Sequence, residues 1–372
     1  MAKSESYKCP KIFNFDYSLC YFCLKRNFPD FKPNKNKSNN DCFICQGIFN
    51  KITEIVKKIF CLIKYEEKYE YRSFSIGTSL PYFMYDKEDY IRSLYKLKNL
   101  ENIKASFNFE IRKYFKAISK KKIELMAPDI KIDLLISKNN EYSVKIISRS
   151  FYLIGRYKKT RMLAQKENNN KKNLQFGNVT NFNINKKESI ETIINNTLSK
   201  FIKSDRTIFT WCGSEDNNSQ VLGKGRLFYI NMINPRERKI RINKIFSHNG
   251  LTFKITEKKD FVGIVNRNYR VKNKIFIQTT KSINNFYLIQ LRKLNNSIIR
   301  YYYKSKYIYK KIYDLKIKKI DSFHLIIFLE CDSGFFLRPF IEGKTFIQPN
   351  ISSILNNQCE CLKFDILDIS YC

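Results

Sequence analysis

The stretch Gly213-Ser-Glu-Asp-Asn-Asn-Ser-Gln-Val-Leu-Gly-Lys-Gly-Arg-Leu-Phe228 lies between two segments that read as β-strands. Residues 206–211 before it and 227–233 after it are rich in β-branched and aromatic side chains, as strands are. The glycines permit tight turns and a close approach of the backbone to a ligand. They place Asp216 in a loop flanked by basic residues. Taken alone, this pattern favours an ordinary hairpin with a solvated aspartate.

The charge balance points to a polyanionic partner. Of the 372 residues, 69 are Lys or Arg and 34 are Asp or Glu, which gives a formal net charge of +35. Such an excess fits nucleic acid better than other common ligands. An AT-rich genome encodes many lysines, so mutational drift is an alternative source of part of the lysine content. A basic membrane-surface protein is the lesser alternative, because no strongly amphipathic basic helix is evident. No apolar run is long enough to span a bilayer, so we expect a soluble, intracellular protein of the nucleus or cytoplasm that is not secreted.

Four of the 11 cysteines form a pattern. Cys20 and Cys23 make one C-x2-C pair, Cys42 and Cys45 make another, and eighteen residues separate the pairs. This is the spacing of a structural zinc site. Four thiolates fill a tetrahedral zinc completely, so one ion bound here would serve folding and not chemistry. Four incidental buried cysteines are the alternative.

The remaining chain predicts two domains. Residues 51–65 and 103–118 read as helices and residues 128–135 and 142–147 as strands, which together predict an α+β module in residues 1–148. An Asn- and Lys-rich insertion at 166–187 falls within the second domain, residues 149–372. There Ser189 is placed to cap a helix, and short β-rich runs follow at 251–255, 274–279, 286–291 and 324–330. This second domain is therefore predicted to be largely antiparallel sheet.

Two further segments carry candidate binding groups. Gly155-Arg-Tyr-Lys-Lys-Thr-Arg161 surrounds a tyrosine with cations, which suits phosphate contact and base stacking. Arg338, in Gly334-Phe-Phe-Leu-Arg338, is a permanent cation able to keep a carboxylate ionised. Only two histidines occur, so we expect any catalysis to use carboxylates, phenols or thiols.

In this order, these segments resemble the archaeal and eukaryotic tRNA pseudouridine synthases of the Pus-ten type, over residues 19–366. The two cysteine pairs are similar to the family's zinc knuckle. The 213–228 stretch is similar to a motif in which Gly-Arg-Glu-Asp is followed by Leu-Gly-x-Gly-Arg-Pro-Phe. Gly334–Arg338 and Pro349-Asn-Ile351 are similar to its carboxyl-terminal motif.

The resemblance implies an α+β protein. A pseudouridine-synthase domain with a central mixed, largely antiparallel sheet would follow an amino-terminal, zinc-containing, THUMP-like RNA-binding domain. It also implies an isomerase of the intramolecular transferase class that acts on uridine 55 in the TΨC arm of tRNA. Whether it also acts on uridine 54 is left open by the resemblance. We expect a monomer that binds tRNA and no membrane, holds one structural zinc and uses no catalytic cofactor.

The resemblance assigns a role to particular positions. Asp216 matches the nucleophile, Arg338 its ion-pair partner, Phe276 the aromatic residue on which the base stacks, and Leu337 the apolar wall of the site. The predicted RNA contacts are Arg156, Tyr157, Lys158, Arg161, Lys224 and Arg226.

The sequence also departs from the family pattern. Ser214 replaces an Arg, Leu227 a Pro, Phe336 a Tyr and Asn218 a second acidic residue, which leaves Asp216 as the nucleophile. A non-catalytic, zinc-containing RNA-binding or RNA-processing factor on the same fold is the alternative function. An unrelated zinc-containing DNA-binding protein is the weaker one, since no helix-turn-helix or zinc-finger helix pattern is visible.

Overall fold

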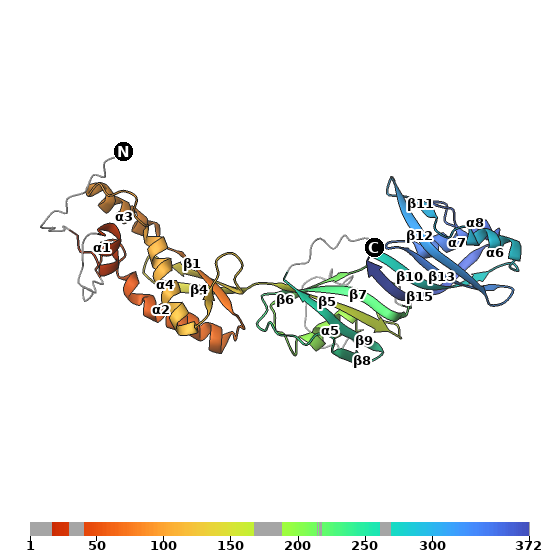
Figure 1. Cartoon of the computed structure of the whole chain (residues 1–372), viewed down its shortest axis with the longest axis horizontal. Helices are drawn as coiled ribbons and strands as arrows, with labels where there is room; N and C mark the ends of the chain where they lie inside the picture. The colour runs from red at the N-terminus through yellow and green to blue at the C-terminus, as the bar shows by residue number, and fades with distance from the viewer. Residues whose placement is uncertain are drawn as a thin grey trace, which may run out of the picture. The chain divides into compact units, whose positions relative to one another are not determined.

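The computed structural model describes residues 17–29, 41–166, 188–213, 215, 218–260 and 269–371. The chain divides into two compact units, whose helices and strands are labelled in Figure 1. Unit 1 comprises Met1–Arg149 with Asn234–Arg238, and unit 2 comprises Ser150–Ile233 with Lys239–Cys372. Most of the predicted insertion at 166–187 lies outside the described residues.

Unit 1 is an α+β module with a four-stranded sheet in the order β2-β1-β3-β4. Strand β1 pairs parallel with β2 and β3, and β3 pairs antiparallel with β4. Its elements in chain order are α1 (Tyr21–Asn27), a 3-10 helix (Ile48–Lys51), α2 (Ile52–Cys61), a π-helical turn (Leu62–Glu66), β1 (Ser73–Ser79), α3 (Tyr82–Leu94), α4 (Ile103–Ser119), β2 (Lys122–Ile123), β3 (Ile130–Ile136) and β4 (Tyr142–Ser148).

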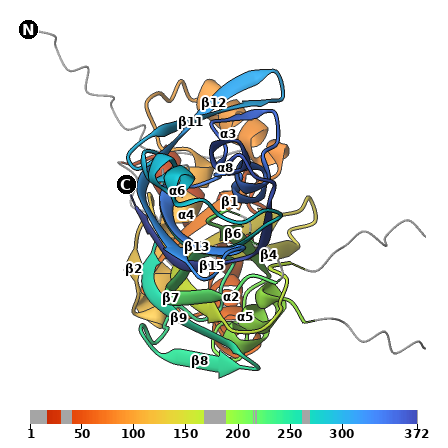
Figure 2. The same ribbon diagram turned by 90° about the vertical axis from the view of Figure 1, so that its right-hand side faces the viewer.

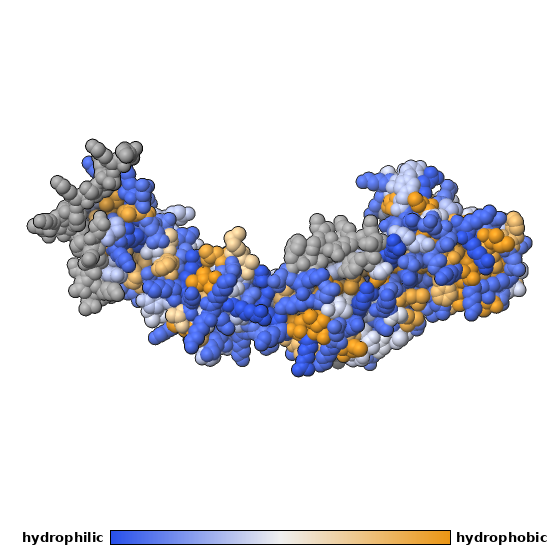
Figure 3. Space-filling model, in the orientation of Figure 1, coloured by the Kyte–Doolittle hydropathy of each residue, from blue (hydrophilic) through white to orange (hydrophobic). Residues whose placement is uncertain are grey.

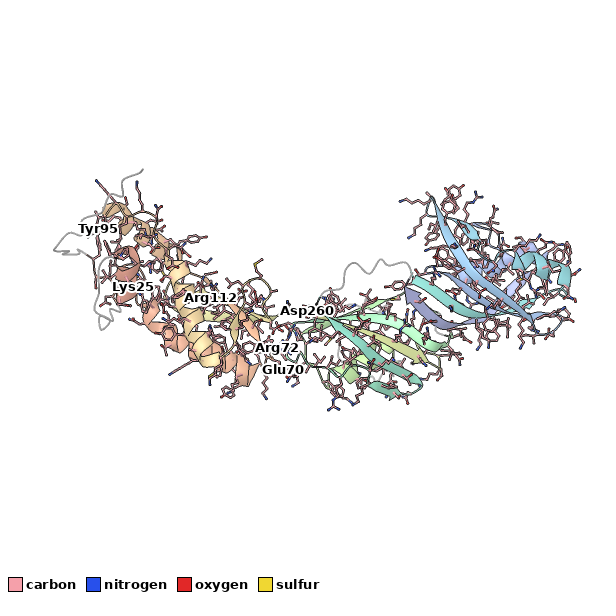
Figure 4. The ribbon with its side chains drawn as sticks, viewed as in Figure 1. Lys25, Glu70, Arg72, Tyr95, Arg112 and Asp260 are labelled. Atoms are coloured by element: carbon pink, nitrogen blue, oxygen red, sulfur yellow. The ribbon has the colours of Figure 1, made fainter. Side chains whose placement is uncertain are left out.

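Helix α4 packs against β1 and α2 because of its four-residue apolar repeat (Figure 1). Ile103, Phe107, Ile111 and Phe115 are fully buried, whereas Ile118 is 40% exposed and lies off this face. Arg112 of α4, labelled in Figure 4, donates from Nε and Nη2 to the Ile76 carbonyl oxygen of β1. The helices and strands predicted between residues 51 and 148 are therefore confirmed.

Residues 234–238 return to unit 1 between two strands of unit 2. Arg236 Nη2 pairs with Glu67 at 2.8 Å, and the Glu70 backbone N–H donates to the Arg236 carbonyl at 2.7 Å. The Arg238 backbone N–H donates to the Glu70 carboxylate at 3.0 Å. These bonds hold residues 234–238 to the rest of unit 1.

Unit 2 is built on one mixed, largely antiparallel sheet in the order β14-β11-β12-β13-β10-β15-β7-β5-β9-β8, with β6 also paired to β7. The β7–β15 pair is parallel and joins two antiparallel halves. Its strands are β5 (Phe151–Lys159), β6 (Arg206–Trp211), β7 (Val221–Ile233), β8 (Ile245–His248), β9 (Leu251–Lys259), β10 (Tyr269–Thr279), β11 (Ile298–Tyr303), β12 (Lys306–Lys319), β13 (His324–Asp332), β14 (Ile347–Gln348) and β15 (Cys359–Tyr371). This architecture confirms the predicted fold class.

Short helices cover parts of this sheet. They are α5 (Ile190–Leu198), α6 (Asn285–Arg292), α7 (Leu337–Glu342) and α8 (Ile351–Leu355). Helix α5 begins at Ser189, whose hydroxyl accepts the Thr192 N–H at 3.1 Å, as predicted. Helices α6 and α8 lie beside each other, as Figure 2 also shows after a turn of 90° about the vertical axis.

The strand predicted at 286–291 is wrong, because these residues lie in α6. The Asn284 side chain accepts the Phe286 N–H and caps the helix. Leu288 and Leu291, three residues apart, are buried, whereas Phe286 and Ile289 are exposed. The buried residues of this apolar run follow a helical period, but the segment is too short for its sequence to distinguish that period from the alternation of a strand.

Candidate active site and metal centre

A bulge in β7 places the basic residues of the Gly-Lys-Gly-Arg segment. Tyr157 and Lys159 of β5 lie opposite Arg226 and Val221 of β7, so β7 holds three extra residues there. Gly223 and Gly225 have φ values of +53° and +79°, and a Cβ on Gly225 would lie 2.6 Å from the Tyr157 carbonyl oxygen. Only glycine fits both positions. The bulge turns Lys224 outward, with 81% of its side chain exposed, and Arg226 inward.

Arg226 belongs to a buried charge cluster around Glu215. One Glu215 oxygen lies 2.9 Å from Arg226 Nη1, and the other lies 2.9 Å from Lys159 Nζ. All three side chains are at most 2% exposed. Tyr157 donates its hydroxyl to Glu215 at 2.8 Å, and Arg226 Nη2 donates to the Cys212 carbonyl at 2.8 Å. The cluster therefore anchors Cys212 and Glu215, and Glu215 immediately precedes Asp216 in the sequence.

The Tyr157 hydroxyl keeps its proton in this cluster. Burial, reinforced by the Glu215 carboxylate, raises the pKa of Tyr157 well above its ordinary value. Two cations, Lys159 and Arg226, thus pair with the Glu215 carboxylate inside unit 2.

A cavity of about 320 Å³ opens next to this anchor. Cys212, Gly213, Glu215 and Arg226 line one part of it, and residues 331–339 line another, including Leu337 and Arg338. Arg338 Nη1 donates to the Cys361 carbonyl oxygen at 2.6 Å. Asp216 and Ser214 lie outside the described residues. The two motifs that the sequence separates by more than a hundred residues therefore border one cavity.

Phe276 does not line this cavity. Its strand β10 pairs regularly with β13 from Arg270 to Gln278, so successive side chains alternate between the two faces of the sheet. Val271 and Asn273 line the cavity, and Phe276 lies on the opposite face, beneath the ammonium groups of Lys274 and Lys363. The structure thus corrects the expected position of Phe276. The aromatic residues that line the cavity are Phe335, Phe336 and Phe364.

The predicted RNA contacts separate into two groups. Tyr157 and Arg226 are buried in the Glu215 cluster. The Tyr157 ring therefore has no exposed face on which a base could stack, contrary to what the sequence had led us to expect. Arg156, Lys158 and Lys224 line a second hollow on unit 2. Arg161 is exposed and lies 3.4 Å from Glu188. Alternation along β5 explains the division, because residues 157 and 159 face the core.

Sequence reasoning missed Glu215 and Lys159. The sequence pattern assigns a role to Asp216 and none to its neighbour Glu215, and it groups Lys159 with the other cations around Tyr157. The alternation of side chains along a strand indicates the burial of Lys159. A lysine two residues after an inward-facing tyrosine must itself point inward, and its charge needs an anion there.

Glu215→Gln tests this anchor. Removing the carboxylate charge breaks both buried ion pairs of Glu215 at once, so we expect the free energy of unfolding of unit 2 to fall by about 3–5 kcal/mol. Trp211 is the only tryptophan and lies in unit 2, so its fluorescence in a urea titration measures the change. The matched control is Glu257→Gln, which breaks an exposed ion pair with Lys259 and should cost less than about 1 kcal/mol. Equal losses in the two variants would contradict the anchor.

Four buried cysteines form a metal-binding arrangement in unit 1. Cys20, Cys23, Cys42 and Cys45 are at most 1% exposed, and their sulfur atoms lie within 4.8 Å of one another. The Sγ atoms of Cys20 and Cys45 are 3.6 Å apart. A tetrahedral zinc with bonds of about 2.3 Å needs sulfurs about 3.8 Å apart, so the donors fit a single ion.

Arg26 connects this cysteine cluster to the rest of unit 1. Its Nη2 lies 3.6 Å from Cys23 Sγ, and its Nε donates to Glu88 of α3 at 2.7 Å. The second Glu88 oxygen accepts the N–H of Ile103, the first residue of α4. The guanidinium offsets part of the negative charge that four thiolates would bring.

No helix within the described parts of the chain is both long enough and apolar enough to cross a membrane.

Family models match both units. The model described as "Pus10, C-terminal" matches residues 152–370, and "Pus10 THUMP domain, archaeal" matches residues 61–134. The first alone covers more than half of the chain. The chain therefore belongs to the Pus10 family of tRNA pseudouridine synthases.

Relatives named "tRNA pseudouridine synthase Pus10" match along most of their length. The protein of Nitrosopumilus maritimus is 30% identical over 371 residues, covering 95% of both chains. That of Pyrococcus furiosus is 24% identical over 399 residues, again covering 95% of each. That of Methanocaldococcus jannaschii is 28% identical over 361 residues, covering 88% of this chain and 75% of its own. These names support an isomerase whose partner is tRNA.

Proposed function

We propose that this protein isomerises uridine 55 in the TΨC arm of tRNA, with Asp216 as nucleophile. One observation carries the proposal. The segment that leads into Asp216 and the segment that supplies Leu337 and Arg338 border the same cavity of about 320 Å³. A cavity of this size suits one flipped-out base and is lined by groups able to enclose it.

The chemistry follows from these positions. The Asp216 carboxylate attacks C1′ and forms a bond to it as the bond between C1′ and N1 breaks. The base turns, C5 bonds to C1′ as the bond between Asp216 and C1′ breaks, the C5 proton leaves, and N1 gains a proton. Atoms and electrons balance without an oxidant or reductant. Arg338 is the cation that keeps Asp216 ionised, Leu337 supports the apolar wall, and Phe336 or Phe364 takes the stacking role expected of Phe276.

The other proposed roles follow the division of the chain. Unit 1 grips the tRNA and sets its distance from Asp216. Its four cysteines hold one zinc ion, which stabilises the fold and takes no part in the reaction. The net charge of +35 supports binding of a polyanion, and the face shown in Figure 3 is largely hydrophilic. We propose that a single copy of the chain binds the tRNA.

Position mapping on an unmodified tRNA transcript tests the proposal. We expect pseudouridine at position 55, detected by carbodiimide modification and primer extension, and none at 55 in a transcript with cytidine there. The same lanes read position 54. Tight tRNA binding without pseudouridine at either position would contradict an enzyme and leave an RNA-binding protein, with Ser214 as the residue that departs from the family.

A further inference from the structure

A second hollow, of about 710 Å³, lies on unit 2 outside the active-site cavity, and the two share no lining residue. It lies over β5, β7 and β9, which run side by side in Figure 1. Four cations line it: Arg156 and Lys158 from β5, Lys224 from β7 and Lys254 from β9. We call this surface the basic groove.

Hydrogen bonds to the backbone of the sheet hold the Arg156 guanidinium in the basic groove. Arg156 Nη1 donates to the Gly225 carbonyl at 2.9 Å, and Nη2 donates to the Ile369 carbonyl at 2.8 Å. Asp368 lies 3.4 Å from Arg156 Nη1 and 3.6 Å from Lys224 Nζ. Among the described residues, one carboxylate therefore pairs with two of the four cations.

Lys158 and Lys254 lack even that partner, since neither forms an ion pair with any residue in the described ranges. Arg156 and Lys254 lie directly opposite each other on paired strands. Like charges in such a cross-strand pair destabilise a sheet. The arrangement costs folding free energy, and a bound anion would remove that cost.

The bulge in β7 contributes to the groove as well as to the active site. The two glycines that turn Arg226 inward also present Lys224 to the groove. Phe253, the one aromatic residue among the lining residues, is 3% exposed and offers no stacking surface for a base. The groove can therefore contact phosphates but cannot read bases by stacking.

We propose that the basic groove binds the sugar-phosphate backbone of the tRNA at a segment away from the reacting uridine. It thereby contributes affinity and orientation and takes no part in the chemistry. The proposal rests on the proposed function only in taking tRNA as the ligand.

The test compares two charge-reversal pairs. The groove variant is Lys158→Glu/Lys254→Glu, and the control is Lys293→Glu/Lys318→Glu, exposed lysines outside the groove with the same change in net charge. We measure the Kd for an unmodified tRNA transcript between 50 and 200 mM salt and the single-turnover rate at saturating tRNA. Trp211 fluorescence in urea confirms that unit 2 remains folded.

We expect the groove variant to bind tRNA at least tenfold more weakly in 100 mM salt, and its salt slope to fall by about 2, one for each lost phosphate contact. The control should change Kd less than threefold and keep the saturated rate within threefold of that of the wild type. Equal weakening in the two variants would overturn the proposal, since only net charge would then matter. If the wild type makes no pseudouridine, the binding measurements still decide the groove, whereas the proposed function fails.

Discussion

Asp216→Ala is expected to abolish pseudouridine formation while tRNA binding survives. Loss of a covalent nucleophile removes the reaction path itself, and comparable substitutions lower rates by a factor on the order of 10⁴ or more. Asp216 is one small side chain in a protein with 69 basic residues, so the Kd for tRNA should change less than about threefold. Single-turnover assays at saturating tRNA, beside a filter-binding titration, measure both quantities.

Asn218→Ala is the matched control. Asn218 is exposed, lies two residues beyond Asp216, and stands where the family motif has its second acidic residue. It should keep the wild-type rate within a few fold. A substantial rate in Asp216→Ala would refute the assigned nucleophile. Loss of tRNA binding in that variant would instead show that the substitution disturbs the surface.

Removal of zinc is expected to unfold unit 1 and to spare unit 2. Binding of a structural zinc contributes about 10–16 kcal/mol in small zinc modules, more than the stability of a typical domain. The cysteines lie in the same core as α2, α4 and the sheet, and Arg26 and Glu88 link them to α3 and α4. A zinc chelator should therefore reduce far-UV circular dichroism, while Trp211 of unit 2 keeps its native fluorescence.

The control for this experiment is the same chelator saturated with zinc beforehand. Cys23→Ser should reproduce the effect without chelator, and Cys61→Ser should not, because Cys61 is exposed and outside the cluster. Release of one zinc per chain should accompany the loss of structure. An unchanged dichroism spectrum after the metal has been removed would contradict a structural site.

Local pattern was sufficient for much of the fold. The cysteine spacing predicted that the four thiols lie together, since two C-x2-C turns present their thiols together wherever the chain brings the turns into contact. The four-residue repeat of α4 and the serine cap of α5 were also readable, because capping and burial periods act over a few residues. The apolar run at 286–291 was misread because six residues do not separate a helical period from a strand.

The sequence by itself determined the family, the α+β class and the candidate nucleophile, since the order of the motifs and the spacing of their residues can be read without knowledge of tertiary contacts. Only the tertiary structure decided which side of a strand each motif residue faces. It showed that Phe276 lies on the face of β10 opposite the cavity. It also showed that Tyr157, Lys159 and Arg226 are buried around Glu215. It also brought Arg156, Lys158, Lys224 and Lys254 into one groove. The reason is physical: strand pairing, bulges and burial depend on partners a hundred or more residues away, and no local pattern records them.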